Sequence, residues 1–485
     1  MNILMCASEG LPFFKTGGLA DVILALSKEY VKKGHNVSVV LPFYKHVDIR
    51  KKYKLKKIYD FNVKMNWRNI STSIYHTLYL GIDYYFIEND QYFYRDNLYG
   101  YYDDGERFAY FNNSIIELIR HLPFLVDIVH VHDHQTAMLP CMIKNLDLNN
   151  KENGYFKDVK TVLTIHNPEF KGYFDKFCLF DFYGLQDKLF DEGKVQLDGQ
   201  VSTLKAGIVY ADKITTVSPT HANELLTNEG GKGLSYDLNL RKNDFVGILN
   251  GMDVEFFNPK KDNLIYKKYS ISSFKIGKKA NKDAFCKEHN LNSELPLVCI
   301  ISRLSEQKGL HLMRDACEYL SYTGCNVAII GSGEEYAINM FSELARRNSK
   351  HVYLYVGYNE ELAHKLYAAS DILLMPSAFE PCGLSQVIAQ SYGTLPLVRL
   401  TGGLKDTVIP YHTVNKDEKS ELNANGFGFT NYDPSNCVVS CGEAINTYLT
   451  ERNVFDRLIK NAMKVNHSWD ESALKYISLY ESIKK

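Results

Sequence analysis

The feature that most constrains the fold is a series of short apolar segments, each followed by a stretch of helical character, that runs along the chain twice. In the first half these segments cover residues 2–7, 36–42, 127–133 and 161–167. In the second half they cover 297–304, 326–333, 351–357, 371–377 and 395–399. Because the segments are apolar throughout rather than at alternate positions, they are typical of parallel strands covered on both faces. The sequence therefore predicts an α/β protein made of two doubly wound parallel sheets.

Length and charge fit this organisation. The chain has 485 residues, enough for two or more domains at roughly 100–200 residues each. We expect the boundary after residues 248–253, where the chain turns polar and rich in lysine at 258–263. Lysine and arginine total 56 against 57 aspartate and glutamate, a net charge of −1. This balance argues against a protein whose whole surface binds nucleic acid or anionic lipid. No apolar run reaches the roughly 18 residues of a membrane span.

The cysteines and the start of the chain bear on the compartment. Ten cysteines in 485 residues are too few for a disulfide scaffold, and no pair has the CxxC spacing of a zinc site. Most lie in apolar runs and are expected to be buried and reduced. The apolar segment 3–7 is too short for the core of a signal peptide and is interpreted as a first strand. We therefore expect a cytosolic or similarly reducing compartment.

In doubly wound sheets, ligands bind beyond the carboxyl ends of the strands, so the residues after each strand are the candidates for chemistry. After the first strand, Lys15, Gly17, Gly18 and Asp21 lie at the start of a helix. Paired glycines allow close backbone approach, and a helix N-terminus favours a phosphate or diphosphate. The GxxxxGK[ST] order of a P-loop is absent. A tight structural turn is the alternative interpretation.

Two histidine-containing segments follow the next strands, at 132–136 and at His166 and Asn167. A metal site is disfavoured because the HExxH and CxxC spacings are missing. Polar groups at strand ends are better placed to hydrogen-bond sugar-like hydroxyls. For each residue separately, helix capping or another structural role remains the alternative.

The second half offers cations, a carboxylate and more glycines at the strand ends. Arg303 and Lys308 follow its first strand and can present two cations to one anion, with a solvated basic turn as the alternative. Glu380 lies beside the glycine-containing turn at 382–385, and a further such turn spans 401–404. An acid next to a phosphate site suits a developing positive charge on a sugar, or its hydroxyls. The GSGEE run at 331–335 lacks the third glycine of a nicotinamide-cofactor fingerprint.

Taken in order, these motifs resemble those of the bacterial and plant glycogen and starch synthases, which are retaining glucosyltransferases of the GT-B fold with two facing Rossmann-like domains. The matching segments extend over essentially the whole chain: KTGGLADV (15–22), HVHDHQT (130–136), TIHN (164–167), VSPTHANE (217–224), LNGMD (249–253), SRLSEQKG (302–309), GYNEELAH (357–364), EPCGLSQ (380–386), YGTLPLVRLTGGLKDTV (392–408) and SWDESALKYISLYESI (468–483). The resemblance implies an N-terminal domain of residues 1–253 joined by the C-terminal helix 467–485. The second, nucleotide-sugar domain would cover 254–466, with an interdomain cleft.

The resemblance also implies roles for individual residues. It places the donor, ADP-glucose, against Lys15, Gly17, Gly18, Asn250, Arg303, Lys308, Tyr358, Glu380, Cys382, Gly383, Leu384 and Ser385. Within that set, Arg303 and Lys308 would neutralise the leaving diphosphate, and Tyr358 would stack on the base. The catalytic group would comprise Glu380, His166, Lys15, Arg303 and Lys308. Glu9, Asp21 and Asn167 would lie on the side where an α-1,4-glucan enters.

The implied reaction is glucosyl transfer to the 4-hydroxyl at the non-reducing end of the glucan, with retention of configuration. No cofactor and no metal ion are expected, and neither nucleic acid nor membrane is an expected partner. The alternatives are a related GT-B enzyme that uses UDP-glucose or a small sugar-phosphate acceptor, and a non-catalytic glucan-binding protein. A pyridoxal-dependent phosphorylase would need a cofactor-bearing lysine segment that is not identified.

The sequence departs from the family at position 134, where relatives usually have tryptophan and this chain has His134. The related Glu-x7-Glu glycosyltransferases have a second glutamate where this chain has Ile388, which favours the synthase branch. The aromatic content is high, with 34 tyrosines and 26 phenylalanines. Tyr358 and Tyr99 are candidates for contact with a ligand, and most of the other aromatic side chains are expected in the core.

Overall fold

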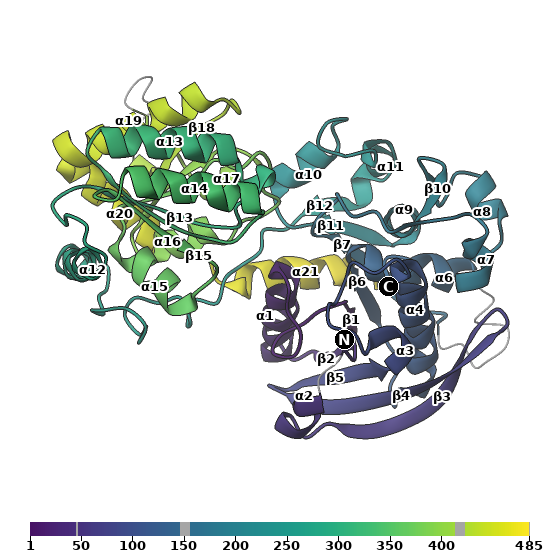
Figure 1. Cartoon of the computed structure of the whole chain (residues 1–485). Helices are drawn as coiled ribbons and strands as arrows, with labels where there is room; N and C mark the ends of the chain where they lie inside the picture. Colours follow the sequence, from purple (N-terminus) through teal and green to yellow (C-terminus); the bar gives the residue numbers. More distant parts are fainter. Residues whose placement is uncertain (45–46, 146–155, 413–421, 485) are drawn as a thin grey trace. The chain divides into compact units, whose positions relative to one another are not determined.

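The computed structural model describes residues 1–44, 47–145, 156–412 and 422–484. The chain divides into two compact units, which we call unit 1 (residues 1–250 and 469–485) and unit 2 (residues 251–468). The sequence placed the corresponding boundaries after residue 253 and before residue 467. Each unit is described by itself, with the elements labelled as in Figure 1.

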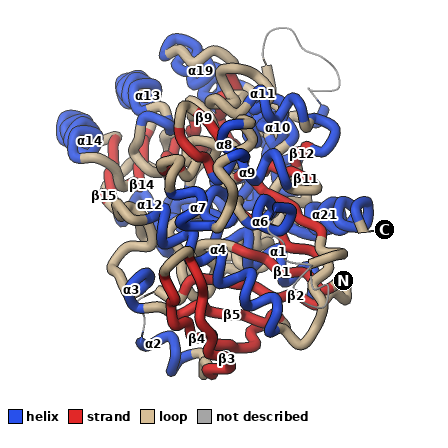
Figure 2. The backbone as a smooth tube through the Cα atoms, turned by 90° about the vertical axis from the view of Figure 1, so that its right-hand side faces the viewer, coloured by secondary structure: helices blue, strands red, loops and turns tan. Residues whose placement is uncertain are grey.

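Unit 1 is built on a nine-stranded sheet within the described residues, in the order β12-β11-β7-β6-β1-β2-β5-β4-β3. Seven of these strands are parallel, from β12 to β5. They are β1 (Asn2–Cys6), β2 (Asn36–Pro42), β5 (Ile82–Glu88), β6 (Ile128–His132), β7 (Lys160–Ile165), β11 (Lys213–Thr216) and β12 (Phe245–Gly247). Figure 2 shows the succession β1, β2, β5, β4 and β3 along one side of this sheet.

The sheet continues into an antiparallel hairpin that the sequence analysis did not predict. Its strands are β3 (Lys56–Met65) and β4 (Arg68–Tyr79), and β4 pairs antiparallel with β5. Exposed and less exposed residues largely alternate along both strands, so neither contains the continuous apolar run by which the parallel strands were recognised. The expected parallel sheet is therefore confirmed in its central part and extended at one edge.

Helices cover the sheet of unit 1, and the longest are α1 (Gly18–Lys32), α4 (Asp104–His121) and α21 (Trp469–Ile483). Helix α21 comes from the end of the chain and packs against α1 (Figure 1). Its buried residues, such as Trp469, Tyr476 and Tyr480, belong to the core of unit 1. The shorter helices are α2 (Val47–Lys52), α3 (Asp90–Phe93), α5 (Asp133–Thr136), α6 (Leu139–Asn145), α7 (Cys178–Tyr183), α8 (Lys188–Asp191), α9 (Thr203–Tyr210), α10 (Pro219–Leu225), α11 (Ser235–Leu240) and the 3-10 turn η1 (Lys242–Asp244). A small second sheet contains β8 (Tyr173–Phe174), β9 (Gln196–Leu197) and β10 (Gln200–Ser202).

Unit 2 is built on a six-stranded, fully parallel sheet within the described residues, in the order β15-β14-β13-β16-β17-β18. The strands are β13 (Leu297–Ile301), β14 (Asn326–Gly331), β15 (Val352–Val356), β16 (Ile372–Met375), β17 (Leu395–Arg399) and β18 (Phe427–Phe429). The helices are α12 (Phe274–Glu288), η2 (Glu306–Lys308), α13 (Leu310–Tyr322), α14 (Glu335–Arg347), α15 (Glu360–Ala369), α16 (Ser385–Ser391), α17 (Gly402–Thr407), α19 (Pro434–Thr450) and α20 (Arg452–Lys464). Two doubly wound parallel sheets, as the sequence predicts, are therefore present.

Several strands end earlier than the sequence predicts, and this matters for the site. The segment 297–304 is a strand only to Ile301, and 371–377 is a strand only from Ile372 to Met375. The residues after these points form the loops that carry the candidate chemistry. The apolar side chains in those loops, such as the buried Leu304, extend the hydrophobic pattern beyond the strand itself.

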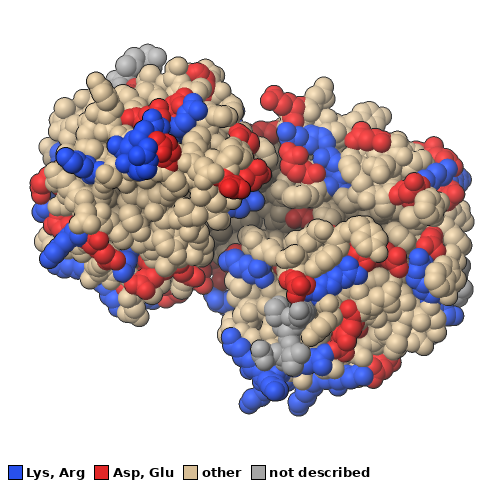
Figure 3. All heavy atoms as spheres, viewed as in Figure 1, with Lys and Arg blue, Asp and Glu red and all other residues tan. Residues whose placement is uncertain are grey.

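Charges of both signs are mixed over the surface shown in Figure 3. Lys and Arg gather at the lower end of unit 1 in this view, where α2 and the start of β3 lie. The stretch 50–57 supplies six cations there, of which Arg50 pairs with Glu88 and Lys57 pairs with Asp60. All ten cysteines are free, and nine of them are buried, as expected from their apolar surroundings. Among the described residues, no helix is both long and apolar enough to cross a membrane.

Candidate active site

The loops at one edge of each sheet carry the candidate residues. In unit 1 the strands β1, β6, β7, β11 and β12 are parallel, so the residues that follow them emerge at a common edge. These loops and the first turn of α1 hold all the site residues expected in unit 1. In unit 2, the residues that follow β13, β15 and β16 likewise share one edge and include all of those expected there.

Glu9 organises the loop between β1 and α1. Its carboxylate Oε2 accepts hydrogen bonds from the backbone N–H of Thr16 at 2.5 Å, from Thr16 Oγ1 at 2.7 Å and from the backbone N–H of Gly17 at 3.4 Å. The side chain is buried, with 3% of its surface exposed. Glu9 thus holds the glycine turn, and its second oxygen, Oε1, lies 3.5 Å from where a Cβ of Gly17 would be.

Lys15 and Asp21 form an ion pair at the start of α1. Lys15 Nζ lies 2.8 Å from Asp21 Oδ1, and the two side chains are 48% and 33% exposed. Gly17 is the N-cap of α1 and makes no side-chain cap, and a Cβ on Gly18 would have nothing within 4 Å. The first turn of α1 is therefore open to an anion next to a solvent-accessible ammonium group.

Asp133 holds the loop after β7 in place. Its Oδ1 accepts hydrogen bonds from the backbone N–H of His166 at 2.7 Å and of Asn167 at 3.3 Å. Asp133 has a φ of 56°, the left-handed region that non-glycine residues seldom adopt. Burial raises the pKa of this carboxyl group to about 7, although the two backbone donors oppose the shift. A strained acid that binds the backbone of two expected site residues is typical of a functional loop.

The imidazole of His166 is hydrogen-bonded to that of His132, with 2.9 Å between His166 Nε2 and His132 Nδ1. Burial lowers the pKa of His166 to about 3 and lowers that of His132 well below its usual value. Both rings are therefore neutral at physiological pH. A neutral His166 can exchange hydrogen bonds with hydroxyl groups but does not carry a positive charge.

A third histidine, His130, connects the sheet to the C-terminal helix. Its Nε2 lies 2.7 Å from Thr164 Oγ1, and its Nδ1 lies 2.7 Å from the hydroxyl of Tyr480 in α21. The Tyr480 hydroxyl also lies 2.8 Å from that of Tyr30 in α1. The His130 ring also contacts the His132 ring, with 4.2 Å between the centroids and 34° between the ring planes. Helix α21 therefore supports the strand that carries His132.

Asn250 and His134 complete the unit 1 residues named by the sequence. Asn250 Oδ1 is buried and has no hydrogen-bond partner among the described residues. The His134 ring lies 6.3 Å from that of Phe108 and 6.4 Å from that of Phe170, measured between centroids. Burial lowers the pKa of His134 to about 4, so this ring is neutral and takes an aromatic place in the packing.

In unit 2, Lys308 and Glu380 are in direct contact. Lys308 Nζ lies 2.5 Å from Glu380 Oε2, and the two side chains are only 14% and 8% exposed. Ser377 Oγ donates to the same carboxylate oxygen at 3.0 Å. Arg303 is exposed and donates to Gln307 Oε1 at 3.3 Å. One of the two expected cations is thus held against the expected acid, and the other extends into solvent.

Two glycines allow the backbone near Lys308 and Glu380 to pack closely. Gly309 has a φ of +80°, and an added Cβ would lie 2.3 Å from the carbonyl oxygen of Pro376. Gly402 has a φ of +45°, and its Cβ would lie 2.0 Å from the carbonyl oxygen of Glu380. That same carbonyl accepts a hydrogen bond from the Gly403 N–H at 3.0 Å. The turn at 401–404 therefore positions Glu380 through its backbone.

The segment 382–385 forms the turn into α16. Gly383 has a φ of +74°, Leu384 is the N-cap and Ser385 is the first residue of the helix. Gln386 fixes the turn because its Nε2 donates to the carbonyl oxygens of Cys382 and Gly383, both at 3.1 Å. Tyr358, after β15, is 69% exposed, so its ring is accessible for stacking.

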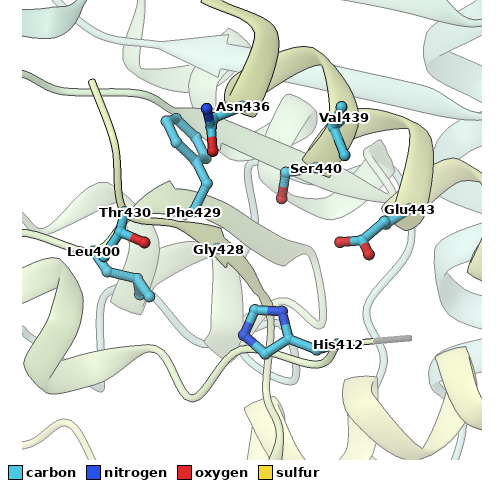
Figure 4. Close-up of a pocket in the computed structure, with 9 residues that line it drawn as sticks. All are labelled: Leu400, His412, Gly428, Phe429, Thr430, Asn436, Val439, Ser440 and Glu443. Atoms are coloured by element: carbon cyan, nitrogen blue, oxygen red, sulfur yellow. The ribbon is translucent and has the colours of Figure 1, made fainter. Parts of the chain in front are cut away.

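A pocket of about 220 Å³ lies elsewhere in unit 2 (Figure 4). Residues from the ends of β17 and β18 and from α19 line it, together with His412. They are Leu400, His412, Gly428, Phe429, Thr430, Asn436, Val439, Ser440 and Glu443. None of them is an expected site residue, so this pocket is separate from the residues described above. The described residues contain no group of three His, Cys, Asp or Glu side chains arranged to hold a metal ion.

The sequence analysis missed some residues that build the site. Thr16 and Ser377 carry no separate signal in the sequence, because each acts by a hydrogen bond to a carboxylate that folding brings near. Asp133 could have been singled out, since it directly follows a strand and is hydrophilic in a buried run. The hydroxyl of Tyr99, which the sequence marks as a candidate for ligand contact, lies 2.8 Å from Ser8 Oγ.

Comparison with known proteins identifies the family. The profile of the starch synthase catalytic domain matches residues 2–240, and that of the glycosyl transferases group 1 matches residues 281–465. The glycogen synthase of Clostridium kluyveri is 41% identical, with all of both chains covered. The chain belongs to the glycogen and starch synthase family.

Further proteins match nearly the whole chain, at different levels of identity. The glycogen synthase of Streptococcus mutans is 40% identical over the full length of both chains. The solved catalytic domain of starch synthase IV from Arabidopsis thaliana, bound to ADP and acarbose, is 32% identical with a TM-score of 0.89 and covers 99% of each chain. A sucrose-phosphate synthase from Thermosynechococcus elongatus, at 14% identity and a TM-score of 0.62, shares the fold. The expected GT-B fold and the resemblance to glycogen and starch synthases are thus confirmed.

Proposed function

We propose that this chain is a glycogen synthase that transfers glucose from ADP-glucose to the 4-hydroxyl at the non-reducing end of an α-1,4-glucan, with retention of configuration. The observation that carries the proposal is the 41% identity to a glycogen synthase over the whole of both chains. The structural relative bound to ADP and acarbose supports a nucleotide donor and a glucan-like ligand. These relatives support glycogen synthesis rather than a small sugar-phosphate acceptor.

Unit 2 provides the groups that suit the donor. Arg303 and Lys308 are the two cations that would stabilise the negative charge on the departing ADP, Arg303 with a planar guanidinium and Lys308 as a compact charge. The turn at 382–385 would offer backbone N–H groups to the distal phosphate. The exposed ring of Tyr358 would stack on the adenine.

Donor binding has to compete with the contact between Lys308 and Glu380. A diphosphate within reach of Lys308 would share its ammonium group and weaken the pair, leaving the Glu380 carboxylate to bind the glucosyl ring. The buried carboxylate would then stabilise positive charge that develops at the anomeric carbon. The pair thus holds a carboxylate and an ammonium group together where both are largely shielded from solvent.

Unit 1 provides groups for the sugar and the acceptor. Lys15, with Gly17 and Gly18, would lie near the diphosphate and the glucosyl bond that breaks. His166 and Asn250 would hold the sugar, and the unpartnered amide oxygen of Asn250 suits a hydroxyl donor. Glu9, Asp21 and Asn167 would line the entry of the glucan.

The proposal includes no metal ion or other cofactor, because the two cations of unit 2 and Lys15 supply the positive charge that a metal would otherwise provide. We also propose a reducing compartment such as the bacterial cytosol, since all ten cysteines are free and most are buried.

A donor competition assay tests the proposal. Purified protein is incubated with glycogen and with labelled ADP-glucose or UDP-glucose, and label in the polymer is measured. We expect incorporation from ADP-glucose, and a large loss of it in Lys15→Ala, Arg303→Ala and Glu380→Ala variants that retain the wild-type melting temperature. Incorporation only into a small acceptor, a preference for UDP-glucose, or full activity in all three variants contradicts the proposal.

A further inference from the structure

The hydrogen bond between His132 and His166 carries an inference about which nitrogen of His166 bears its proton. The two residues follow one another across adjacent parallel strands, where His132 ends β6 and His166 comes just after β7. Nδ1 of His132 and Nε2 of His166 are 2.9 Å apart. Since both rings are neutral, each carries one N–H, and only one of them lies in the shared bond.

Two arrangements satisfy this bond. In the first, His132 Nδ1–H donates to a bare Nε2 of His166, and Nε2 of His132 is left as a bare acceptor. In the second, His166 Nε2–H donates to His132 Nδ1, and the proton of His132 must then lie on its Nε2.

The surroundings of His132 decide between the two. The side chain is fully buried, and its Nε2 has no hydrogen-bond partner within the part of the chain that the structure describes. The second arrangement would therefore leave an N–H buried without an acceptor, whereas the first leaves only an acceptor lone pair unused. Buried N–H donors without a partner are the rarer of the two in folded proteins. The first arrangement is favoured.

We propose that His132 is a positioning residue that fixes His166 in the tautomer with its proton on Nδ1. Nε2 of His166 is engaged by His132, and the backbone of His166 is held by Asp133. The free edge of the ring then presents Nδ1–H as a hydrogen-bond donor. The consequence for a ligand rests on the proposed function: a sugar oxygen that contacts His166 at Nδ1 accepts a hydrogen bond rather than donating one.

The inference is tested by NMR on the full chain labelled with 15N-histidine. Two-bond 1H–15N correlations distinguish the two neutral tautomers, and the His166 signals are assigned as those missing from a His166→Ala spectrum. We expect a protonated Nδ1 and a bare Nε2 for His166 at about pH 7.5, well above the lowered pKa. A protonated Nε2 on His166 overturns the inference. Because this readout needs no substrate, it stands or fails independently of whether the chain extends glycogen.

Two substitutions of His132 test the positioning role. His132→Asn places an amide close to the position of Nδ1 and can donate to His166, whereas His132→Leu has no donor. We expect His132→Leu to mix the two tautomers of His166 and to lower kcat for glucosyl transfer by at least about tenfold, with a smaller effect on KM. His132→Asn should keep the Nδ1–H tautomer and retain most of kcat. If both variants lower kcat equally, or if His132→Leu leaves the tautomer unchanged, the positioning role is wrong.

Discussion

The ammonium group of Lys308 lies 2.5 Å from Oε2 of Glu380, although the two residues are 72 positions apart in the sequence. Both side chains are nearly buried, and the carboxylate has a second donor in Ser377 Oγ. Removal of one partner of such a pair leaves the other charge buried without compensation, which costs more than replacing both.

We therefore expect Lys308→Met to lower the free energy of unfolding by about 3 kcal/mol. The double variant Lys308→Met with Glu380→Gln should regain most of that loss, because a neutral amide still accepts from Ser377. Urea denaturation of the two variants measures the difference. Both should have lost glucosyl transfer. A double variant no more stable than the single one would show that the buried charge is not the source of the loss.

Gly402 and Gly324 both have positive φ, but only Gly402 lies against the backbone of Glu380. Gly402→Ala would place a Cβ 2.0 Å from the carbonyl oxygen of Glu380, so this loop must shift. Gly324 also has a positive φ, of +83°, but a Cβ there has nothing within 4 Å. We expect Gly402→Ala to lower kcat at least about tenfold through misplacement of Glu380. Gly324→Ala should cost only about 1 kcal/mol of stability and leave kcat unchanged. Equal kcat values in the two variants would contradict the role given to the turn at 401–404.

The histidines of unit 1 predict a loss of stability in acid. Burial lowers the pKa of His130 and of His166 to about 3, from a usual value of 6.5. Between these values the unfolded chain binds more protons than the folded one, so stability falls as the pH drops below about 6.5. When the pH is lowered from about 7.5 to about 5, the free energy of unfolding of His130→Gln should fall by about 2 kcal/mol less than that of the wild type. Denaturant titrations at the two pH values measure this, and parallel losses would contradict it.

The raised pKa of the Asp133 carboxyl group predicts the opposite dependence of stability on pH. Its pKa is raised to about 7 from 3.8, so between these values the folded chain binds more protons, and the contribution of Asp133 to stability declines as the pH rises through this window. Asp133→Asn removes the charge and keeps an oxygen that accepts from the backbone of His166 and Asn167. As the pH rises from about 5 to about 8, we expect the free energy of unfolding of the variant to increase relative to that of the wild type by at least about 1 kcal/mol. A difference that does not change with pH would be the contrary result.

The hydrogen bonds that run from Tyr30 through Tyr480 to His130 predict that the two tyrosine hydroxyls contribute unequally to stability. If the Tyr30 hydroxyl donates to Tyr480 and the Tyr480 hydroxyl donates to His130 Nδ1, both buried protons have acceptors. Tyr480→Phe would then leave the Tyr30 proton without its acceptor and His130 without its donor, at a cost of about 1–3 kcal/mol. Tyr30→Phe removes only a donor and should cost less. Thermal unfolding of the two variants compares them, and a larger loss in Tyr30→Phe would reverse the assigned direction.

Continuous apolar strands were predictable because burial on both faces leaves a pattern within a few residues. The segment 36–42 was predicted at its observed limits, and 395–399 likewise. The hairpin of β3 and β4 was not predicted, because its strands have one exposed face and its pairing depends on contact with β5. Local pattern thus identifies central strands better than those at the edge of a sheet.

For the site, the sequence could name residues but not their partners. The loops after the strands were identifiable from the strands themselves. The contacts of Lys308 with Glu380, and of Asp133 with the backbone of His166, join segments that are distant in the sequence. Only the packing of neighbouring parallel strands brings these groups within hydrogen-bond distance, so composition and spacing carry no record of them.

The attachment of α21 to unit 1 has a consequence for synthesis of the chain on the ribosome. Residues 1–250 emerge first, but the helix that packs on α1 and supplies Tyr480 to His130 is translated only after residues 251–468. The nascent first unit therefore lacks part of its core until residues 251–468 have been translated. A chain that stops within unit 2 leaves that surface uncovered, so unit 1 can be completed only after unit 2 has been synthesised.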